Sequence, residues 1–197
     1  MNSSASHPLV SFIIPCYNQG NLIVETVMSA LNQQYANIEV WVINDGSTDA
    51  ATLEALKNLP ANVQQVSIEN AGPSVARNLA VKQCKGKYIV PLDGDDLILP
   101  DTLEKAIPIL ESNESIAVVY GNNQLFGAKN ELIMQTNFSI LLIGIPRQLY
   151  PIHSHVGFHN SRRFYILCIN DRKCYKRTSI FWPINNWRYV TNFTFLP

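Results

Sequence analysis

Residues 88–96 read Tyr-Ile-Val-Pro-Leu-Asp-Gly-Asp-Asp, an apolar run that leads directly into three carboxylates and one glycine. The β-branched, apolar part is typical of a buried strand, which places Asp93, Asp95 and Asp96 in a turn at its carboxyl end. Two carboxylates about 5 Å apart repel by roughly 3 kcal/mol at an effective dielectric of about 20, so this turn needs a bound cation or a shared proton. Such oxygen ligands suit Mg²⁺ or Mn²⁺, and a solvated Asp-Gly turn that caps a helix is the alternative.

The chain on either side of this turn alternates between strand and helix patterns. Helical patterns fall between the apolar runs, and in the helix that begins at Gly72 we expect Val75 and Leu79 to be buried. In the helix at residues 100–110 we expect Pro108 to kink or stop the helix. The alternation predicts an α/β fold with a mostly parallel sheet flanked by helices, in which ligands bind at the carboxyl ends of the strands. The other expected strands are residues 9–14, 38–43, 63–68 and 116–120, and the other expected helices are residues 21–33 and 48–59.

The composition is that of a globular chain with the length of one domain. Of the 197 residues, 47% are hydrophobic and 15% are charged, which excludes a disordered or fibrous protein. The formal net charge of zero hides an asymmetry. Residues 1–146 carry seven basic and fourteen acidic side chains, whereas residues 147–197 carry eight basic and one acidic side chain. We therefore expect a chain of two unlike parts, the first acidic and the second basic.

The spacing of the cysteines and the hydropathy of the chain indicate in which cellular compartment the protein is found. The four cysteines are scattered and form no Cys-x-x-Cys pair, which is typical of reduced thiols. The N-terminus lacks a basic segment followed by a long apolar run, and no apolar stretch reaches the roughly 20 residues that a membrane span needs. We expect a cytoplasmic protein.

Polar residues follow three of the expected strands. The first strand ends in Pro15-Cys16-Tyr17-Asn18, and the second leads into Asp45 and a Gly-Ser-Thr sequence. Because the carboxyl ends of parallel strands share one edge, these residues and the acidic turn should lie together. Tyr17 offers a ring for stacking a base, Asp45 offers an acceptor for a nucleobase N–H, and the acidic turn offers a metal for phosphates. Each feature alone has a plain structural explanation, but together they predict a nucleoside-diphosphate site.

Four ordered segments resemble one known family. Residues 10–18, 38–49, 72–78 and 92–96 are similar to the motifs of the nucleotide-sugar glycosyltransferases of family 2, which have the GT-A fold, a Rossmann-like architecture. The family usually carries two Asp before the Gly-Ser-Thr, whereas this chain has Asn44 at the first position. The resemblance implies an inverting, metal-dependent enzyme of glycan or polysaccharide biosynthesis that transfers a sugar from a nucleotide-diphosphate-sugar to a hydroxyl acceptor. The acceptor would be a glycan or a lipid-linked molecule, with no nucleic acid as a partner.

The resemblance also implies the residues that bind the donor nucleotide. Pro15 and Tyr17 would line the base pocket, with Asn18 beside them in the same motif. Asp45 would bond the base, and Arg77 would lie beside the diphosphate and the acidic turn. Arg77 pairing with one acid on a helix surface is the structural alternative.

The acidic turn corresponds to the Asp-x-Asp (DXD) motif of the family. By resemblance, Asp95 is the direct ligand of Mg²⁺ or Mn²⁺, and Asp93, also assigned to the nucleotide and metal site, lies nearer the ribose or the metal-bound waters. A metal that bridges the diphosphate oxygens neutralises the charge that develops as the glycosidic bond breaks.

The family pattern does not continue beyond about residue 140. The resemblance therefore implies a nucleotide-sugar-binding GT-A half at residues 1–135, followed by an atypical basic and aromatic tail at residues 136–197. Inverting members need a carboxylate general base, and the tail offers only Asp171, whose pKa the adjacent Arg172 and Lys173 would lower. We therefore assign no catalytic residue. One hypothesis makes the tail a frameshifted or truncated reading of a longer gene, which would leave a non-catalytic fragment that binds nucleotide diphosphate and metal. The other makes it a basic, aromatic segment that docks on a membrane surface or an anionic partner.

Overall fold

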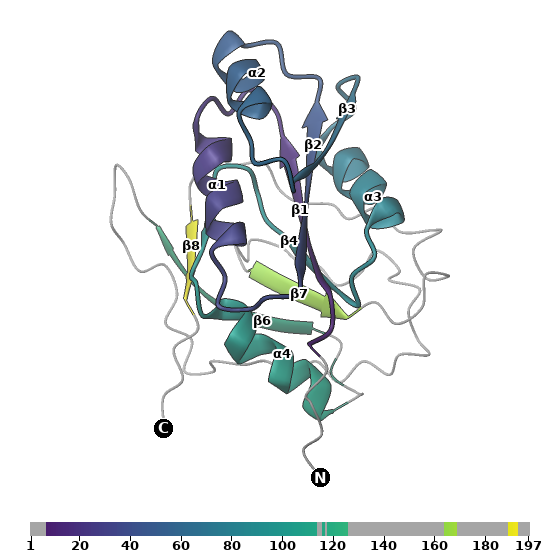
Figure 1. The fold of residues 1–197 in the computed structure, drawn as a ribbon, viewed down its shortest axis with the longest axis vertical. Helices are drawn as coiled ribbons and strands as arrows, with labels where there is room; N and C mark the ends of the chain where they lie inside the picture. The colour runs from purple at the N-terminus through teal and green to yellow at the C-terminus, as the bar shows by residue number, and fades with distance from the viewer. Residues whose placement is uncertain (1–6, 114–115, 117, 126–163, 169–188, 193–197) are drawn as a thin grey trace.

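The computed structural model describes residues 7–113, 116, 118–125, 164–168 and 189–192. Strands and helices alternate along the first part, as the sequence predicts, and all five expected strands are present (Figure 1). In chain order the elements are β1 (Val10–Cys16), α1 (Leu22–Leu31), β2 (Ile38–Asp45), α2 (Ala50–Lys57), β3 (Gln64–Ile68), α3 (Pro73–Gln83), β4 (Tyr88–Pro91), β5 (Leu97–Ile98), α4 (Thr102–Ser112), β6 (Val118–Leu125), β7 (Phe164–Cys168) and β8 (Tyr189–Asn192).

The strands form an eight-stranded sheet in the order β3-β2-β1-β4-β7-β6-β8-β5. The first four strands of this order are parallel: β1 pairs with both β2 and β4, and β2 pairs with β3. Their carboxyl ends therefore share one edge of the sheet, which the sequence analysis requires for a ligand site. The prediction of an α/β fold with a mostly parallel sheet flanked by helices is confirmed.

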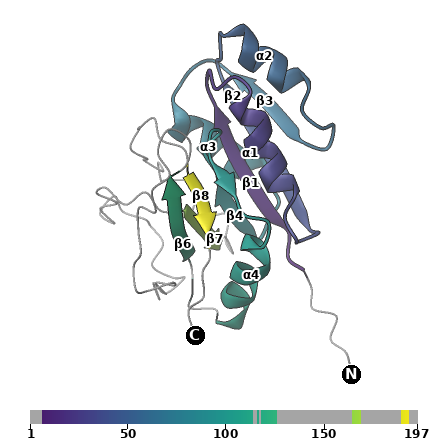
Figure 2. The ribbon, with the colours of Figure 1, turned by 90° about the vertical axis from the view of Figure 1, so that its left-hand side faces the viewer.

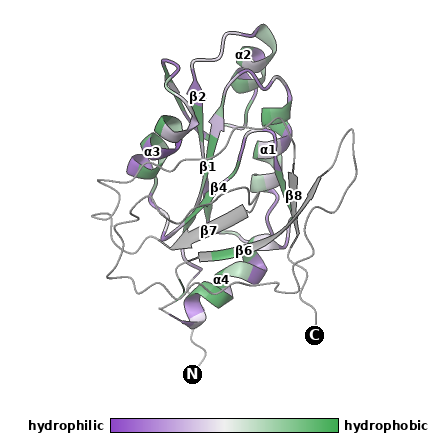
Figure 3. Cartoon of the chain, turned by 180° about the vertical axis from the view of Figure 1, so that it is seen from behind, coloured by the Kyte–Doolittle hydropathy of each residue, from purple (hydrophilic) through white to green (hydrophobic). Residues whose placement is uncertain are grey.

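Helices cover both faces of the parallel strands because successive strand residues point to opposite faces. On one face, Ile13, Ile43 and Ile89 pack against Ala76 and Ala80 of α3. On the other face, residues such as Phe12, Val42 and Val90 share a larger core with α1, α2 and α4. Figures 1 and 2 show α3 and α1 on opposite sides of β1, and Figure 3 shows the hydrophobic colour of β1 and β4 between these layers.

Val75 differs from the sequence prediction, and of the two outcomes expected for Pro108 the structure excludes a stop, while a kink stays a prediction. Val75 is 48% exposed, because α3 presents its small residues Ala76 and Ala80 to the sheet, while Leu79 is partly buried as expected. The helix α4 does not stop at Pro108 but continues to Ser112. Pro108 is exposed, so its ring lies away from the core while Ala106, Ile107 and Leu110 pack against the sheet.

Two short segments of the region 136–197 belong to the same sheet. The strand β7 lies between β4 and β6 and is antiparallel to both. The strand β8 is antiparallel to β6 and parallel to β5, which directly follows the acidic turn. The division of the chain at residue 135 stays a prediction. Among the described residues, no helix has the length and hydropathy that crossing a bilayer requires.

Polar contacts close the amino ends of the parallel strands. The Ser11 hydroxyl donates to Glu39 Oε1 at 2.5 Å, and the Gly86 amide donates to the same oxygen at 3.0 Å and to Ser11 Oγ at 2.8 Å. The Lys85 amide also donates to Glu39 Oε1. We call Ser11, Glu39, Lys85 and Gly86 the amino edge.

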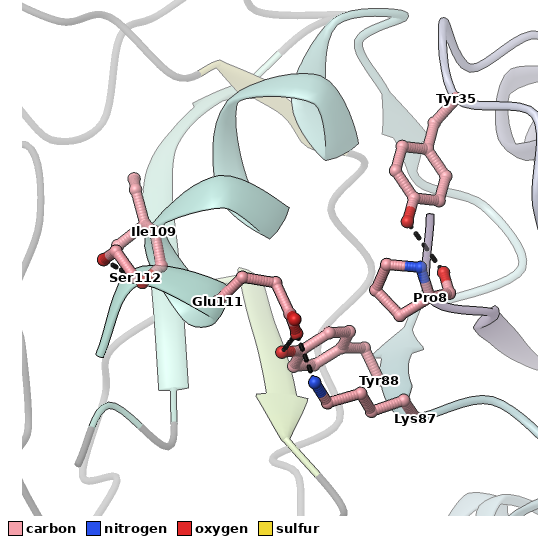
Figure 4. Close-up of polar contacts among 7 residues, drawn as sticks. All are labelled: Pro8, Tyr35, Lys87, Tyr88, Ile109, Glu111 and Ser112. Atoms are coloured by element: carbon pink, nitrogen blue, oxygen red, sulfur yellow. Dashed lines mark hydrogen bonds and ion pairs between the residues drawn. The ribbon is translucent and has the colours of Figure 1, made fainter. Parts of the chain in front are cut away.

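A neighbouring group of contacts holds α4 against the start of β4 (Figure 4). Glu111 accepts hydrogen bonds from Lys87 Nζ at 2.5 Å and from the Tyr88 hydroxyl. The Tyr35 hydroxyl donates to the carbonyl of Pro8 at 2.7 Å, and burial, reinforced by the charge of Glu111, raises the pKa of Tyr35 to about 12. These contacts are satisfied within the chain and therefore serve the fold.

Candidate functional site

The loops that follow β1, β2, β3 and β4 pack against one another at the opposite end of the strands. We call residues 15–20, 44–49, 69–72 and 92–96 the carboxyl edge. Gly94 shows how close this packing is, because a Cβ atom added there would lie 2.8 Å from the carbonyl oxygen of Pro15 and would collide with Gln19 Oε1. Only glycine fits at this position, and the acidic turn is thereby held directly against the loop that carries Tyr17.

Asn18 joins the first loop to the second. Its side-chain oxygen accepts hydrogen bonds from the backbone amides of Thr48 at 2.8 Å and Asp49 at 3.2 Å, and its backbone N–H donates to Ser47 Oγ at 3.1 Å. Asn18 also has a φ of 50°, a conformation that Asn adopts more readily than most residues. Its assignment to the nucleotide site stays a prediction, and in the structure its side chain holds the two loops together.

Tyr17, next to this junction, is 49% exposed. An exposed aromatic ring on a loop that is fixed at both Pro15 and Asn18 is an available stacking surface. Cys16, by contrast, is buried, and its burial raises the pKa of the thiol to about 12, although a hydrogen bond with Ser47 opposes this shift. Cys16 is therefore a core residue and not a nucleophile.

Asn44 explains why this chain tolerates an amide where the family usually has a carboxylate. Its side-chain oxygen accepts from the Ser47 amide at 3.0 Å, which closes the turn after β2. Its side-chain nitrogen donates to Ser67 Oγ on β3 at 3.3 Å. An aspartate could accept both from the Ser47 amide and from the Ser67 hydroxyl, so either residue can close the turn after β2.

Asp45 is 2% exposed, and each of its two oxygens accepts one backbone N–H. The donors are the amide of Ala71 at 2.8 Å and the amide of Gly72 at 2.9 Å, directly before α3. Beside it, Gly46 has a φ of 71° and approaches Asn70 so closely that an added Cβ would lie 2.6 Å from the Asn70 amide nitrogen. The predicted bond from Asp45 to a base stays a prediction, and the observed contacts tie the second loop to the third.

Arg77 and Asp93 form an ion pair between α3 and the acidic turn. The Arg77 side chain is 3% exposed and that of Asp93 is 45% exposed, so the carboxylate faces outward and the guanidinium lies beneath it. The structural alternative for Arg77 is met in part, because Arg77 does pair with an acid but is buried and not on the helix surface. The pair also places a permanent positive charge directly behind the acidic turn.

Asp95 is half-buried and Asp96 is 9% exposed, with the Asp96 amide donating to the Asp93 carbonyl at 2.9 Å to close the turn. Among the residues that the structure describes, no group of three or more His, Cys, Asp or Glu side chains is arranged to hold a metal. Mg²⁺ and Mn²⁺ bind through one or two carboxylates and take their other ligands from substrate phosphates and water. The acidic turn fits a metal of that kind and does not fit an all-protein site.

The chain is similar to one protein-family model and to several known proteins. Residues 11–180 match the family model Glycosyl transferase family 2. The chain belongs to this family. The motif resemblance ends at about residue 140, whereas the family match continues to residue 180 and includes β7.

Several proteins named as glycosyltransferases are similar over 58–64% of the chain. The chondroitin synthase of Escherichia coli is 42% identical over 129 residues, which are 64% of this chain and 19% of that protein. The hyaluronan synthase of Pasteurella multocida is also 42% identical over 129 residues, with 64% of this chain and 13% of that protein covered. An uncharacterised glycosyltransferase of Haemophilus influenzae is 38% identical over 119 residues, covering 58% of this chain and 47% of that protein. The chain thus spans less than half of each of these relatives.

Solved glycosyltransferase structures share the fold. Staphylococcus aureus TarS matches with a TM-score of 0.52 and 29% identity over 64% of this chain and 23% of that chain. A shorter form of TarS in complex with UDP matches with a TM-score of 0.51 and 27% identity over 64% of this chain and 38% of that chain. The predicted GT-A fold of this family 2 member is confirmed.

The sequence analysis missed the contacts that hold this site together. Gln19 packs against Gly94, yet no motif assigned it a role, and its position four residues after Pro15 was the only available signal. Likewise, nothing in the sequence predicted that Asn18 would join the first and second loops. Such contacts depend on how neighbouring loops pack, which short-range patterns do not encode.

Proposed function

We propose that this family 2 chain transfers a sugar from a nucleotide-diphosphate-sugar to a hydroxyl acceptor, with inversion and with a divalent metal, in glycan or polysaccharide biosynthesis. One observation carries the proposal. The carboxyl edge holds an exposed aromatic ring at Tyr17 and, on the neighbouring strand end, an acidic turn backed by the buried cation of Arg77. These are the groups that a base, a metal and a diphosphate require.

The nucleotide would bind along this edge. The base would stack on Tyr17 beside Pro15, where the fixed loop keeps the ring in place. The diphosphate would lie over the acidic turn, within reach of the guanidinium of Arg77, whose planar donors match phosphate oxygens. Relatives named chondroitin synthase and hyaluronan synthase, and the TarS structures with UDP and with UDP-GlcNAc, support a nucleotide-sugar donor.

Asp95 would be the direct ligand of Mg²⁺ or Mn²⁺, and Asp93 would contact the ribose or metal-bound water. The bound metal would supply the positive charge that stabilises the diphosphate leaving group. Asp93 has a second task, because its carboxylate also orients Arg77. The chain's own contribution is to hold two acids and one guanidinium in fixed positions before the donor binds, so that little reorganisation accompanies the reaction.

A glycan or lipid-linked hydroxyl would be the acceptor, and a carboxylate would take its proton. The strands that complete the described sheet, β6, β7 and β8, contain no Asp or Glu. This observation favours a second candidate function, in which the chain binds nucleotide diphosphate and metal without catalysing transfer. The transferase, by contrast, would need a carboxylate from outside these three strands.

The two candidates differ in turnover. The chain would be incubated with UDP-GlcNAc and Mn²⁺, with release of UDP measured in the presence and absence of a polysaccharide acceptor, beside a calorimetric titration with UDP. Release of UDP that requires both Mn²⁺ and Asp95 supports the transferase. Binding of UDP without any release supports the non-catalytic candidate, and absence of both contradicts the two together.

A further inference from the structure

We infer that Asp45 is a positioning residue that fixes the start of α3 and, through it, the guanidinium of Arg77 at the place of the donor phosphates. This inference rests on the proposed function and extends it, because the family resemblance relates Asp45 only to the base. The inferred role concerns the diphosphate of the ligand and not its base.

The carboxylate of Asp45 is held in two directions at once. Each oxygen accepts a different backbone amide, from Ala71 at 2.8 Å and from Gly72 at 2.9 Å. Gly72 is the residue that caps α3, so the carboxylate lies at the positive end of that helix. With an exposure of 2%, the side chain has little room to turn away from these amides.

The backbone next to Asp45 also fixes the end of β2 against the start of α3. Gly46 has a φ of 71° and touches the third loop at Asn70. Gly72 itself has a φ of 89°, which a residue with a side chain rarely adopts. The end of β2 and the start of α3 are thus fixed to each other by both side-chain and backbone contacts.

The helix α3 carries this constraint to the acidic turn. It begins at Pro73, packs its small residues Ala76 and Ala80 against the sheet, and bears Arg77 one turn from its start. Arg77 is 3% exposed and pairs with Asp93. Because a helix moves as a rigid rod over one turn, a shift at Gly72 displaces the guanidinium by a similar amount.

The two roles of Asp45 predict different results for a ligand without a base. If Asp45 contacts only the base, its replacement weakens the binding of UDP and leaves the binding of inorganic pyrophosphate unchanged. If Asp45 positions Arg77, its replacement weakens the binding of both ligands. Asp45→Asn is the informative change, because the asparagine N–H₂ would face one of the two backbone amides, donor against donor.

The experiment is a calorimetric titration of the full chain with inorganic pyrophosphate and with UDP, each in the presence of Mn²⁺. We expect Asp45→Asn to bind pyrophosphate about tenfold more weakly than the wild type, which corresponds to about 1.4 kcal/mol. Glu39→Gln is the matched control. Glu39 likewise accepts two backbone amides, from Lys85 and Gly86, but it lies at the amino edge, so pyrophosphate affinity should not change. Tyr17→Ala should weaken the binding of UDP and leave the binding of pyrophosphate unchanged.

Wild-type affinity for pyrophosphate in Asp45→Asn would overturn the inference while leaving the proposed function intact. If the wild type binds neither UDP nor pyrophosphate with Mn²⁺, the proposed function fails and the inference fails with it. Should Asp45→Asn not fold, as judged by circular dichroism, Gly46→Ala replaces it. That variant keeps the carboxylate and pushes the third loop away at Asn70, and unchanged pyrophosphate affinity in it would equally overturn the inference.

Discussion

The two ends of the parallel strands use the same residue types in opposite ways. At the amino edge, Glu39 accepts hydrogen bonds from Ser11, Lys85 and Gly86, all within the protein. At the carboxyl edge, Asp93 pairs with the buried Arg77 while its own side chain remains 45% exposed. The first carboxylate stabilises the fold, and the second, in the proposed site, would present its charge to a ligand. Changes at the two edges should therefore affect different measurements.

The largest expected effect is on ligand binding at the carboxyl edge. Asp95→Asn removes the charge of the proposed direct metal ligand and should weaken Mn²⁺-dependent binding of UDP by about a hundredfold or more, since loss of even an outer-shell partner costs about 10–100-fold. Calorimetry measures the affinity, and circular dichroism checks that the variant is folded. Wild-type affinity in this variant would remove the acidic turn from the proposed site.

A matched pair of glycine substitutions compares the edges directly. An added Cβ at Gly94 meets the carbonyl oxygen of Pro15 at 2.8 Å, and one at Gly86 meets the Ser11 amide nitrogen at 2.7 Å. Both Gly94→Ala and Gly86→Ala should lower the free energy of unfolding by about 1–3 kcal/mol, because each overfills a packed site.

Only the first of these substitutions should change affinity. A misplacement of about 1 Å can cost up to about a hundredfold, so Gly94→Ala should weaken UDP binding by about tenfold or more. Gly86→Ala should retain the wild-type Kd in the fraction that is folded. Equal loss of affinity in the two variants would mean that the edges are not functionally separate.

The next effect is on stability at the amino edge. Burial raises the pKa of Glu39, but the hydrogen bonds from the Ser11 hydroxyl and the Lys85 and Gly86 amides outweigh it, so the pKa lies below its usual value of 4.5. Glu39→Gln replaces charge-assisted hydrogen bonds with neutral ones, and because Glu39 is half-buried we expect a loss of about 1 kcal/mol at pH 7. This corresponds to a decrease in Tm of about 2–4 °C, with Kd for UDP unchanged.

The pH dependence of this difference follows from the lowered pKa. A carboxyl whose pKa is lower in the folded state stabilises the protein above its unfolded pKa, and this contribution is lost as the pH falls through the folded pKa. The difference in Tm between the wild type and Glu39→Gln should therefore be full at pH 7 and shrink below about pH 4.5. A difference that is constant or grows on acidification would contradict the assignment.

The smallest expected effect concerns Cys16, the core residue directly before Tyr17. With a pKa raised to about 12 by burial, its thiol should not react with iodoacetamide in the folded chain at pH 8 and should react fully in urea. Mass spectrometry of the peptide that contains Cys16 measures both. Rapid alkylation in the folded chain would mean that the carboxyl edge opens more than the structure shows.

The predictable part of the molecule is the part that short-range patterns encode. Apolar runs such as the one in β1, which is buried along its whole length, and helix signals such as Gly72-Pro73 located the four parallel strands and their helices. The clustering of Tyr17, Asp45 and the acidic turn followed from strand direction alone. The prediction that Val75 is buried was wrong, because helical periodicity gives the spacing of residues on a face but not which face of the helix packs against the sheet.

The remaining part depends on pairings between distant residues. The strand β7 is a five-residue apolar run, yet its position between β4 and β6 joins residues far apart in the sequence. Nothing within that run determines its partners, and the change to antiparallel pairing breaks the strand-helix alternation on which the prediction relied. The two amides that hold Asp45 are likewise 26 and 27 residues away in the chain.

The central claim is that the carboxyl edge binds a metal-diphosphate unit, and titration of the wild-type chain with UDP in the presence of Mn²⁺ and in the presence of EDTA tests it most directly. We predict saturable one-to-one binding with Mn²⁺ that is at least about tenfold weaker with EDTA, because a metal-free diphosphate faces the repulsion of Asp93 and Asp95. No binding, or the same affinity under both conditions, would contradict the claim.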